Sequence, residues 1–133
     1  MSKLVTKQIR GHLVSSSALS SYVGASDIKV GWDKLPHEFP SIIITQTGGG
    51  AYGYLGYKTS PGGSRIRRET VSMQLDIYST KSRLETLQME DIITPLLIVS
   101  SQARKESDID TFDDELKAYR KILSYTITQF HDD

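Results

Sequence analysis

The feature that most constrains this chain is a glycine-rich stretch, Thr47 to Glu69, which separates its two clearest strand patterns. It holds most of the ten glycines and three of the seven tyrosines, and it shows neither a helical period nor a clean alternation. A loop of this length in a small domain is usually functional or disordered, and ordering each residue costs roughly 1–2 kcal/mol. We therefore predict an extended flexible arm over residues 47–69 that a partner orders.

The segments around this arm read as strands. Ser41 to Gln46 contains three consecutive isoleucines, which is typical of a strand covered on both faces. Glu69 to Tyr78 alternates apolar and polar residues, as does Tyr119 to Phe130 near the C-terminus. Asp27 to Trp32 is a plausible short strand, and the tail from His131 to Asp133 should fray.

Two longer segments read as helices. Ser2 to Val14 places apolar residues four apart on one face, and a second short helical turn follows around residues 18–23. Ser82 to Val99 begins with Ser82 and Glu85 at the spacing of a capping box. Pro95 should kink this helix or end its first segment, because proline lacks the N–H and clashes with the preceding turn.

The segment from Ser100 to Leu116 is polar and reads as a solvated connection, with a short strand around residues 108–112. The order is then helix, strand, strand, arm, strand, helix, strand. This order predicts a single domain over residues 1–133 of the two-layer α+β class. Its sheet should be mainly antiparallel, with two helices packed on one face and a long glycine-rich loop.

The totals exclude several function classes. Net charge is zero, so there is no global field to attract nucleic acid or a membrane. The chain has no cysteine, which removes disulfides, thiolate metal sites and cysteine nucleophiles. No apolar run approaches 18 residues, and residues 1–4 do not resemble a signal peptide. We expect a soluble product made in the cytoplasm, without a membrane partner.

Residue patterns for catalysis, cofactors and metals are missing. His12, His37 and His131 lie in unconnected contexts without a second metal ligand nearby, and the acidic residues between 108 and 115 lack the calcium-loop pattern. The glycines of the arm lead to a strand and not to a helix, unlike a phosphate-binding loop. We therefore expect no catalytic residues, no cofactor and no metal, and a protein that is not an enzyme.

The arm carries the candidate site residues. Its positive charges leave three readings open: solvated charges, contact with an acidic neighbour in an oligomer, or contact with DNA in a pore. Tyrosines suit a protein interface, because they offer large contact area with little entropy loss. The candidates for an assembly interface or a DNA-lined lumen are Tyr52, Tyr54, Tyr57, Lys58, Arg65, Arg67 and Arg68.

The layout as a whole resembles the tail-completion, or tail-terminator, family of long-tailed bacteriophages. The resemblance covers nearly the full chain and consists of diffuse patterns and not of one invariant signature. The segments that carry it are Leu19–Gly24, Trp32–Pro36, Phe39–Ile44, Val71–Ser79 and Tyr119–Ile127.

This resemblance implies a virion protein of the head–tail neck that forms a homo-oligomeric ring, usually hexameric. Such a ring caps the finished tail tube, stops further polymerisation and joins the tail to the head. Its partners would be the tail tube protein and the head connector or head-completion protein, with non-specific contact to genomic DNA in the lumen. The arm is long and glycine-rich for this family, which leaves open whether it contacts the tube, the connector or the lumen.

Two alternatives stay open beside this reading. One is a head-completion or connector-adaptor protein at the adjacent position of the same neck. The other is a small nucleic-acid-binding module that uses Arg65, Arg67 and Arg68. Salt-dependent affinity of the isolated monomer for DNA would favour the second alternative.

Overall fold

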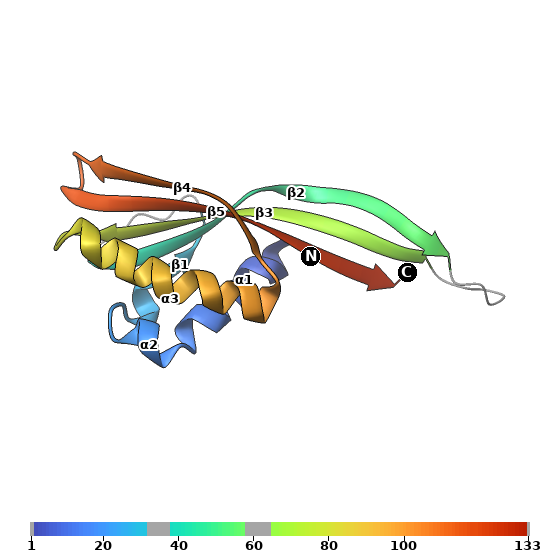
Figure 1. The fold of residues 1–133 in the computed structure, drawn as a ribbon, viewed down its shortest axis with the longest axis horizontal. Coiled ribbons are helices and arrows are strands. Elements are labelled where there is room, and N and C mark those ends of the chain that lie inside the picture. The colour runs from blue at the N-terminus through green and yellow to red at the C-terminus, as the bar shows by residue number, and fades with distance from the viewer. Residues whose placement is uncertain (1, 32–37, 58–64, 133) are drawn as a thin grey trace.

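A computed structural model describes residues 2–31, 38–57 and 65–132 of the chain (Figure 1). Helices and strands form an α+β fold in two layers, as predicted. Trp32, the proline-rich loop with His37, and Lys58 lie outside the described residues. The elements are α1 Ser2–Val14, α2 Ser17–Ser20, a 3-10 turn at Ala25–Asp27, β1 Ile28–Val30, β2 Ser41–Tyr57, β3 Arg65–Ser79, α3 Arg83–Ser101, β4 Arg104–Asp113 and β5 Ala118–Asp132.

The described strands form one sheet in the order β1-β2-β3-β5-β4. β1 lies parallel to β2, and the pairs β2–β3, β3–β5 and β4–β5 are antiparallel. The sheet is thus mainly antiparallel, as the alternating patterns predict. β2, β3 and β5 extend well past the helices, so the molecule has a body, where helices cover the sheet, and a projecting ribbon (Figure 1).

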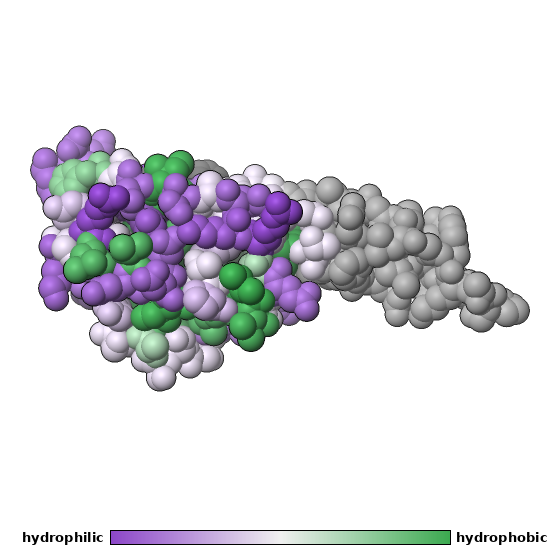
Figure 2. All heavy atoms as spheres, in the orientation of Figure 1, coloured by the Kyte–Doolittle hydropathy of each residue, from purple (hydrophilic) through white to green (hydrophobic). Residues whose placement is uncertain are grey.

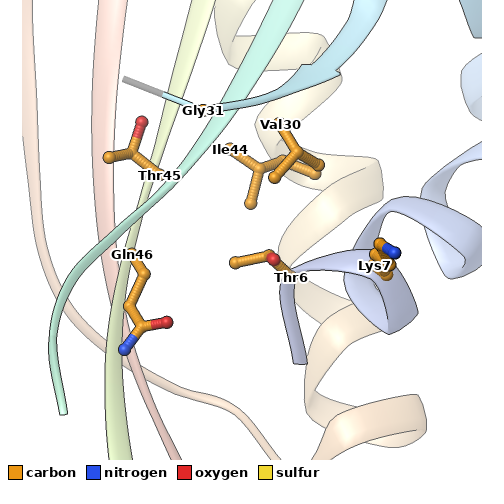
Figure 3. A pocket seen from close by; sticks show the side chains of 7 residues that line it. All are labelled: Thr6, Lys7, Val30, Gly31, Ile44, Thr45 and Gln46. Atoms are coloured by element: carbon orange, nitrogen blue, oxygen red, sulfur yellow. The ribbon is translucent and has the colours of Figure 1, made fainter. Parts of the chain in front are cut away.

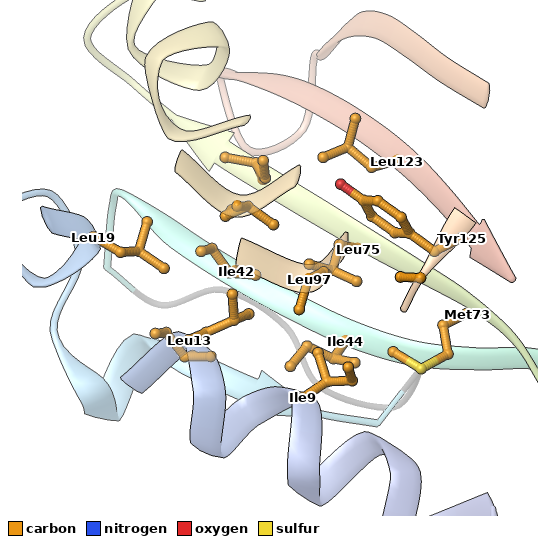
Figure 4. Packing of buried hydrophobic residues seen from close by; sticks show 14 of the residues in the cluster. Ile9, Leu13, Leu19, Ile42, Ile44, Met73, Leu75, Leu97, Leu123 and Tyr125 are labelled. Atoms are coloured by element: carbon orange, nitrogen blue, oxygen red, sulfur yellow. The ribbon is translucent and has the colours of Figure 1, made fainter. Parts of the chain in front are cut away.

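The core lies between the helices and one face of the sheet. α1 contributes Val5, Ile9 and Leu13, all buried, which confirms the predicted apolar face of this helix. Figure 4 shows Ile9 and Leu13 packed toward Ile42 and Ile44 of β2. The other large buried side chains of this cluster include Leu19, Met73, Leu75, Ile77, Met89, Ile93, Leu97, Leu123 and Tyr125.

α3 begins as its sequence predicts but does not end at its proline. The Ser82 hydroxyl accepts a hydrogen bond from the Glu85 amide at 3.1 Å, which caps the first turn. The helix continues through Pro95 to Ser101, so the alternative in which Pro95 ends a segment is wrong. Ile93 and Leu97 on either side of the exposed proline are fully buried. This packing against the sheet outweighs the loss of one backbone hydrogen bond.

The polar segment after α3 is a longer strand than predicted. β4 spans ten residues, where we expected a solvated connection with a short strand at 108–112. Its side chains are exposed or half-exposed along the whole strand, so no apolar alternation marks it. Only the pairing with β5, from Arg104 opposite Thr126 to Asp113 opposite Ala118, defines the strand.

A smaller cluster lies on the opposite face of the sheet. Ile43 packs there with Tyr78 and Ala118, which accounts for a run of isoleucines buried on both faces of β2. Arg120 lies over the Tyr78 ring at 5.6 Å and pairs with Asp76 at 3.1 Å. The prediction that residues 42–44 form a doubly covered strand is confirmed.

Candidate assembly surfaces

The glycine-rich stretch forms part of the sheet. β2 continues through Gly48 to Tyr57, and β3 already begins at Arg65. The prediction that residues 47–69 lack regular structure is therefore wrong for residues 47–57 and 65–69. Three-stranded pairing explains the difference: β5 runs to Asp132 and pairs with β3 along this extension, so His131 and Asp132 are strand residues and not a frayed tail. We call residues 45–57 of β2, 65–72 of β3 and 126–132 of β5 the ribbon.

The ribbon brings most of the predicted site residues together at the level of the backbone. Tyr54 pairs with Arg67, and Tyr57 pairs with Arg65. Tyr52 lies opposite Glu69, and Arg68 lies opposite Gly53. Tyrosines and arginines that are 8 and 13 positions apart in sequence thus become cross-strand neighbours. Lys58 lies outside the described residues.

β2 carries extra residues along the ribbon. The register shifts between Gln46 and Gly48, between Gly49 and Ala51, and between Tyr54 and Gly56, while β3 advances by one residue each time. Each shift is a bulge on the outer strand, which bends the strand and increases its twist. These irregularities remove the two-residue period from β2 and explain why the sequence does not read as a strand.

At the other end of the sheet, a network of charged side chains ties the edge strand β4 to α3. Lys105 of β4 pairs with Glu90 of α3 at 2.5 Å and with Asp108 at 2.7 Å. Lys121 of β5, itself buried, pairs with Asp110 at 3.1 Å and with Glu90 at 3.3 Å. Arg83 at the start of α3 completes the network by donating to Asp110 at 2.8 Å.

The network favours the charged forms of Lys105 and Asp110. Hydrogen bonds to Asp108 and Glu90 raise the pKa of Lys105 above its ordinary value. Burial pushes the pKa of Asp110 upward, but the hydrogen bonds from Arg83 and Lys121 outweigh it, so this pKa lies below its ordinary value. Such pairing fixes β4 on the body and gives the network a structural role, without a group prepared for proton transfer.

Sequence reasoning missed this network. The only local signal is Glu90, an acidic residue beside Met89 within the apolar face of the predicted helix. A buried carboxylate there requires a cation, because an unpaired buried charge is costly. Its partners Lys105 and Lys121 come from strands whose pairing the sequence does not reveal.

Exposed apolar side chains lie on α3 and on the β4–β5 hairpin. Leu84 is 59% exposed and Val99 is 83% exposed, and Phe112 stacks edge-on against Tyr119 with ring centroids 5.2 Å apart. Two shallow hollows of about 270 and 330 Å³ lie beside Arg83 and Asp110, between α3 and this hairpin. Figure 2 shows separate hydrophobic groups set among hydrophilic residues on this face, and no continuous apolar patch.

A larger hollow of about 440 Å³ lies between α1 and the β1–β2 edge. Figure 3 shows the side chain of Thr6, from α1, directed toward Gln46 of β2, with Ile44 and Val30 nearby. The lining combines the aliphatic residues Val30 and Ile44 with polar residues and the cation Lys7. The complete lining is Thr6, Lys7, Val30, Gly31, Ile44, Thr45 and Gln46.

Within residues 2–31, 38–57 and 65–132, no group of three or more His, Cys, Asp or Glu residues is arranged to hold a metal ion. None of the described helices combines the length and the apolar character that crossing a membrane requires.

No protein-family model matches the chain, and no curated protein matches it in sequence. The two-layer α+β fold does have a counterpart among solved structures. It is a chain of a structure described as "Virion of native gene transfer agent (GTA) particle", with a TM-score of 0.56 over 92% of both chains. At 9% identity, this similarity concerns the fold.

Proposed function

We propose that this chain is a structural protein of a phage-like virion, with no catalytic role. The observation that supports this most directly is the fold shared with a chain of a gene transfer agent virion, because it spans 92% of both chains. The fold alone does not define a function, so the ribbon and its edges supply the second argument.

Within the virion, we propose the role of a tail terminator at the neck between head and tail. The chain would form a homo-oligomeric ring, hexameric as is usual in the family it resembles, on the end of the tail tube. Its mechanism would be geometric, because a heterologous interface that closes into a ring cannot add further subunits as a filament does. One side of the ring would meet the tube protein and the other the head connector or head-completion protein.

The ribbon suits an assembly element better than an independent domain. It is a single layer of three strands beyond the helices (Figure 1). A layer of this kind gains little stability by itself in water and is stabilised when another surface covers it. We propose that assembly orders it, with Tyr52, Tyr54 and Tyr57 as contact residues.

The first experiment tests ring formation. Light scattering across a range of protein concentrations, combined with negative-stain electron microscopy, should show closed rings or a mixture of monomer and ring. A strict monomer at high concentration that neither caps tail tubes nor binds connectors would overturn the proposal. Binding to the connector alone, with no effect on tube length, would instead favour the head-completion alternative.

The second experiment tests the ribbon. Residues 50–70 are replaced by Asn-Gly, which joins Gly49 directly to its register partner Val71 through a two-residue turn. This variant should remain folded but fail to join heads to tails in an assembly assay. Val99→Ser, a change at an exposed position of α3, provides the matched control and should retain joining.

The nucleic-acid alternative depends on Arg65, Arg67 and Arg68. If DNA contact is the main role, the isolated monomer should bind duplex DNA, with an affinity that falls steeply as salt increases. Replacing all three arginines with glutamine should then remove binding. A monomer that shows no DNA affinity at low salt would exclude this alternative and leave the terminator proposal in place.

A further inference from the structure

The edges of the sheet at β4 and at β2 differ in charge. β4, which forms the edge of the body, has charged side chains at six of its ten residues. Charges of this kind discourage pairing with another strand. β2 has no charged residue in its 17 residues, although it forms an edge over most of its length.

The outer side of β2 is open beyond Ile44. β1 covers it only at Ile42, Ile43 and Ile44, and a last bond runs from the Gly31 amide to the Ile44 carbonyl at 2.9 Å. Among the residues that the structure describes, no strand pairs with this side from Thr45 to Tyr57. The Gly48 carbonyl accepts a hydrogen bond from the Gln46 side chain at 3.3 Å. Apart from this bond, no described strand competes for the backbone groups of this edge, so they can pair with an added strand.

The opposite side of the ribbon has a second open edge. Pairing between β4 and β5 ends at Arg104 and Thr126, and β5 continues to Asp132. In the described part of the chain, only β3 pairs with β5 from Ile127 onward. The ribbon thus has one free edge on β2 and another on β5.

The two free edges lie at the same level along the ribbon. Val71 of β3 pairs with Gly49 on one side and with Ile127 on the other. Five positions earlier in β3, Ile66 pairs with Gly56 and with Asp132. Residues 49–56 of β2 and 127–132 of β5 therefore face outward on opposite sides over the same length.

We propose that the β2 edge of one copy of this chain pairs with the β5 edge of the next copy. β2 and β5 are both antiparallel to β3, so they run in the same direction. Rotation about a ring axis that follows the strands preserves that direction, and the intermolecular ladder is therefore parallel. This inference rests on the proposed ring, and it names the surfaces that close it.

Three observations favour a second copy over another occupant. The free edge on β2 has a matching free edge on the same molecule, at the same level and in the direction that a parallel ladder needs. Neither edge carries a run of charges that would oppose pairing, in contrast to β4. The two edges also lie on opposite sides of the ribbon, so each copy can contact two neighbours.

Cysteine cross-linking tests this arrangement, and the absence of native cysteine makes it clean. Gln129→Cys is combined in turn with Gly49→Cys, Ala51→Cys, Gly53→Cys or Leu55→Cys, which allows for a stagger between copies. Mild oxidation of the assembled full-length protein should give a ladder of disulfide-linked dimers, trimers and higher species for at least one pair. The single variants should give no ladder.

The control pair is Gln129→Cys with Thr111→Cys, which moves the second cysteine to the β4 edge and should give no ladder. Rings in the electron microscope without cross-links at any β2 position would overturn the pairing but leave the terminator proposal intact. Disulfide dimers from single β2 variants would overturn it in favour of a two-fold β2–β2 contact. Absence of both rings and ladders would overturn the pairing and the ring together.

A charge on the edge gives an independent measurement that does not need oxidation. Ala51→Lys should raise the protein concentration at which rings replace monomers in light scattering by at least tenfold, because a lysine on an edge strand opposes strand addition. Its melting temperature as a monomer should match the wild type. Thr111→Lys on β4 is the matched variant and should assemble normally. Loss of assembly in Thr111→Lys but not in Ala51→Lys would contradict the proposal.

Discussion

The body and the ribbon are built from the same three strands, yet different interactions hold them. In the body, Ile44, Leu75 and Leu123 of β2, β3 and β5 lie fully buried beneath the helices. In the ribbon, the three strands stay paired in the backbone ladder but project beyond the helices (Figure 1). The comparison shows that a strand need not keep one kind of sequence along its length.

The difference also separates stability from assembly. Burial of apolar area contributes about 25 cal/mol per Å², and it is concentrated in the body. Isolated ladders of two or three strands contribute little by themselves in water. We therefore expect changes in the body to alter the free energy of unfolding, and changes in the ribbon to alter association.

The largest effect should come from the core of the body. Leu75→Ala removes a fully buried side chain at the centre of β3 and should lower the free energy of unfolding by about 2–5 kcal/mol. Urea denaturation followed by circular dichroism measures it. Leu87→Ala on the exposed side of α3 is the control, with an expected change within about 0.5 kcal/mol. Equal effects of the two variants would contradict the assigned core.

A smaller effect should come from the charge network that holds β4. Glu90→Gln weakens the pairing of Lys105 and Lys121, although Asp108 and Asp110 still contact them, so we expect a loss of about 1–3 kcal/mol. The same denaturation experiment measures it. Asp91→Asn, at the neighbouring exposed position, should change little. An unchanged Glu90→Gln variant would show that the network does not stabilise the body.

The helix cap should contribute less again. Ser82→Ala removes the acceptor for the Glu85 amide and should lower the free energy of unfolding by about 1 kcal/mol. Ser100→Ala, exposed in the last turn of α3, serves as the control. A loss as large as that of Leu75→Ala would contradict the small contribution assigned to this cap.

Acid should lower the free energy of unfolding of the body gradually as the pH falls. The pKa of Asp110 is lower in the folded state than in the unfolded chain, so its contribution is fully present above the unfolded value of about 3.9 and is lost as pH falls through the folded value. Stability measured between pH 6 and pH 2 should therefore decline below about pH 4. Asp110→Asn should flatten part of that decline, and an unchanged slope would exclude Asp110 as a contributor.

The smallest effect on stability should come from removing most of the ribbon. Replacing residues 50–70 with Asn-Gly leaves Val71 and the other buried residues in place, so the melting temperature should shift by only a few degrees. Differential scanning calorimetry of the monomer measures it. If this variant unfolds, the ribbon belongs to the cooperative core, and the distinction between body and ribbon is wrong.

Sequence patterns predicted those elements whose side chains have a regular inside and outside. The predicted bounds of α1 and the capped start of α3 match the structure, and β3 and β5 contain the predicted strands. The full length of β4 was not predicted because none of its residues is buried, and the ribbon was not predicted because its pairing partners are distant in sequence. The expectation that Pro95 could end the helix was wrong because the packing of the residues on both sides of it leaves no local signal.

The candidate site was predictable in composition but not in arrangement. The glycine-rich stretch and its tyrosines and arginines stand out in the sequence, and their place beyond the helices agrees with a projecting arm (Figure 1). The pairing of Tyr54 with Arg67, and of Tyr57 with Arg65, depends on register. Register follows from bulges and from a third strand, neither of which the local sequence reveals.

The bulges of β2 also act as a phase adjustment. Tyr52, Tyr54 and Tyr57 are unevenly spaced in sequence, yet they pair with Glu69, Arg67 and Arg65, which are evenly spaced by two. The extra residue between Tyr54 and Gly56 restores the step that uneven spacing would break. Deleting Leu55 would therefore remove the bulge and leave Tyr57 opposite Arg65, in phase with the other two tyrosines. One deletion can thus separate the bend in the strand from the pairing of these residues.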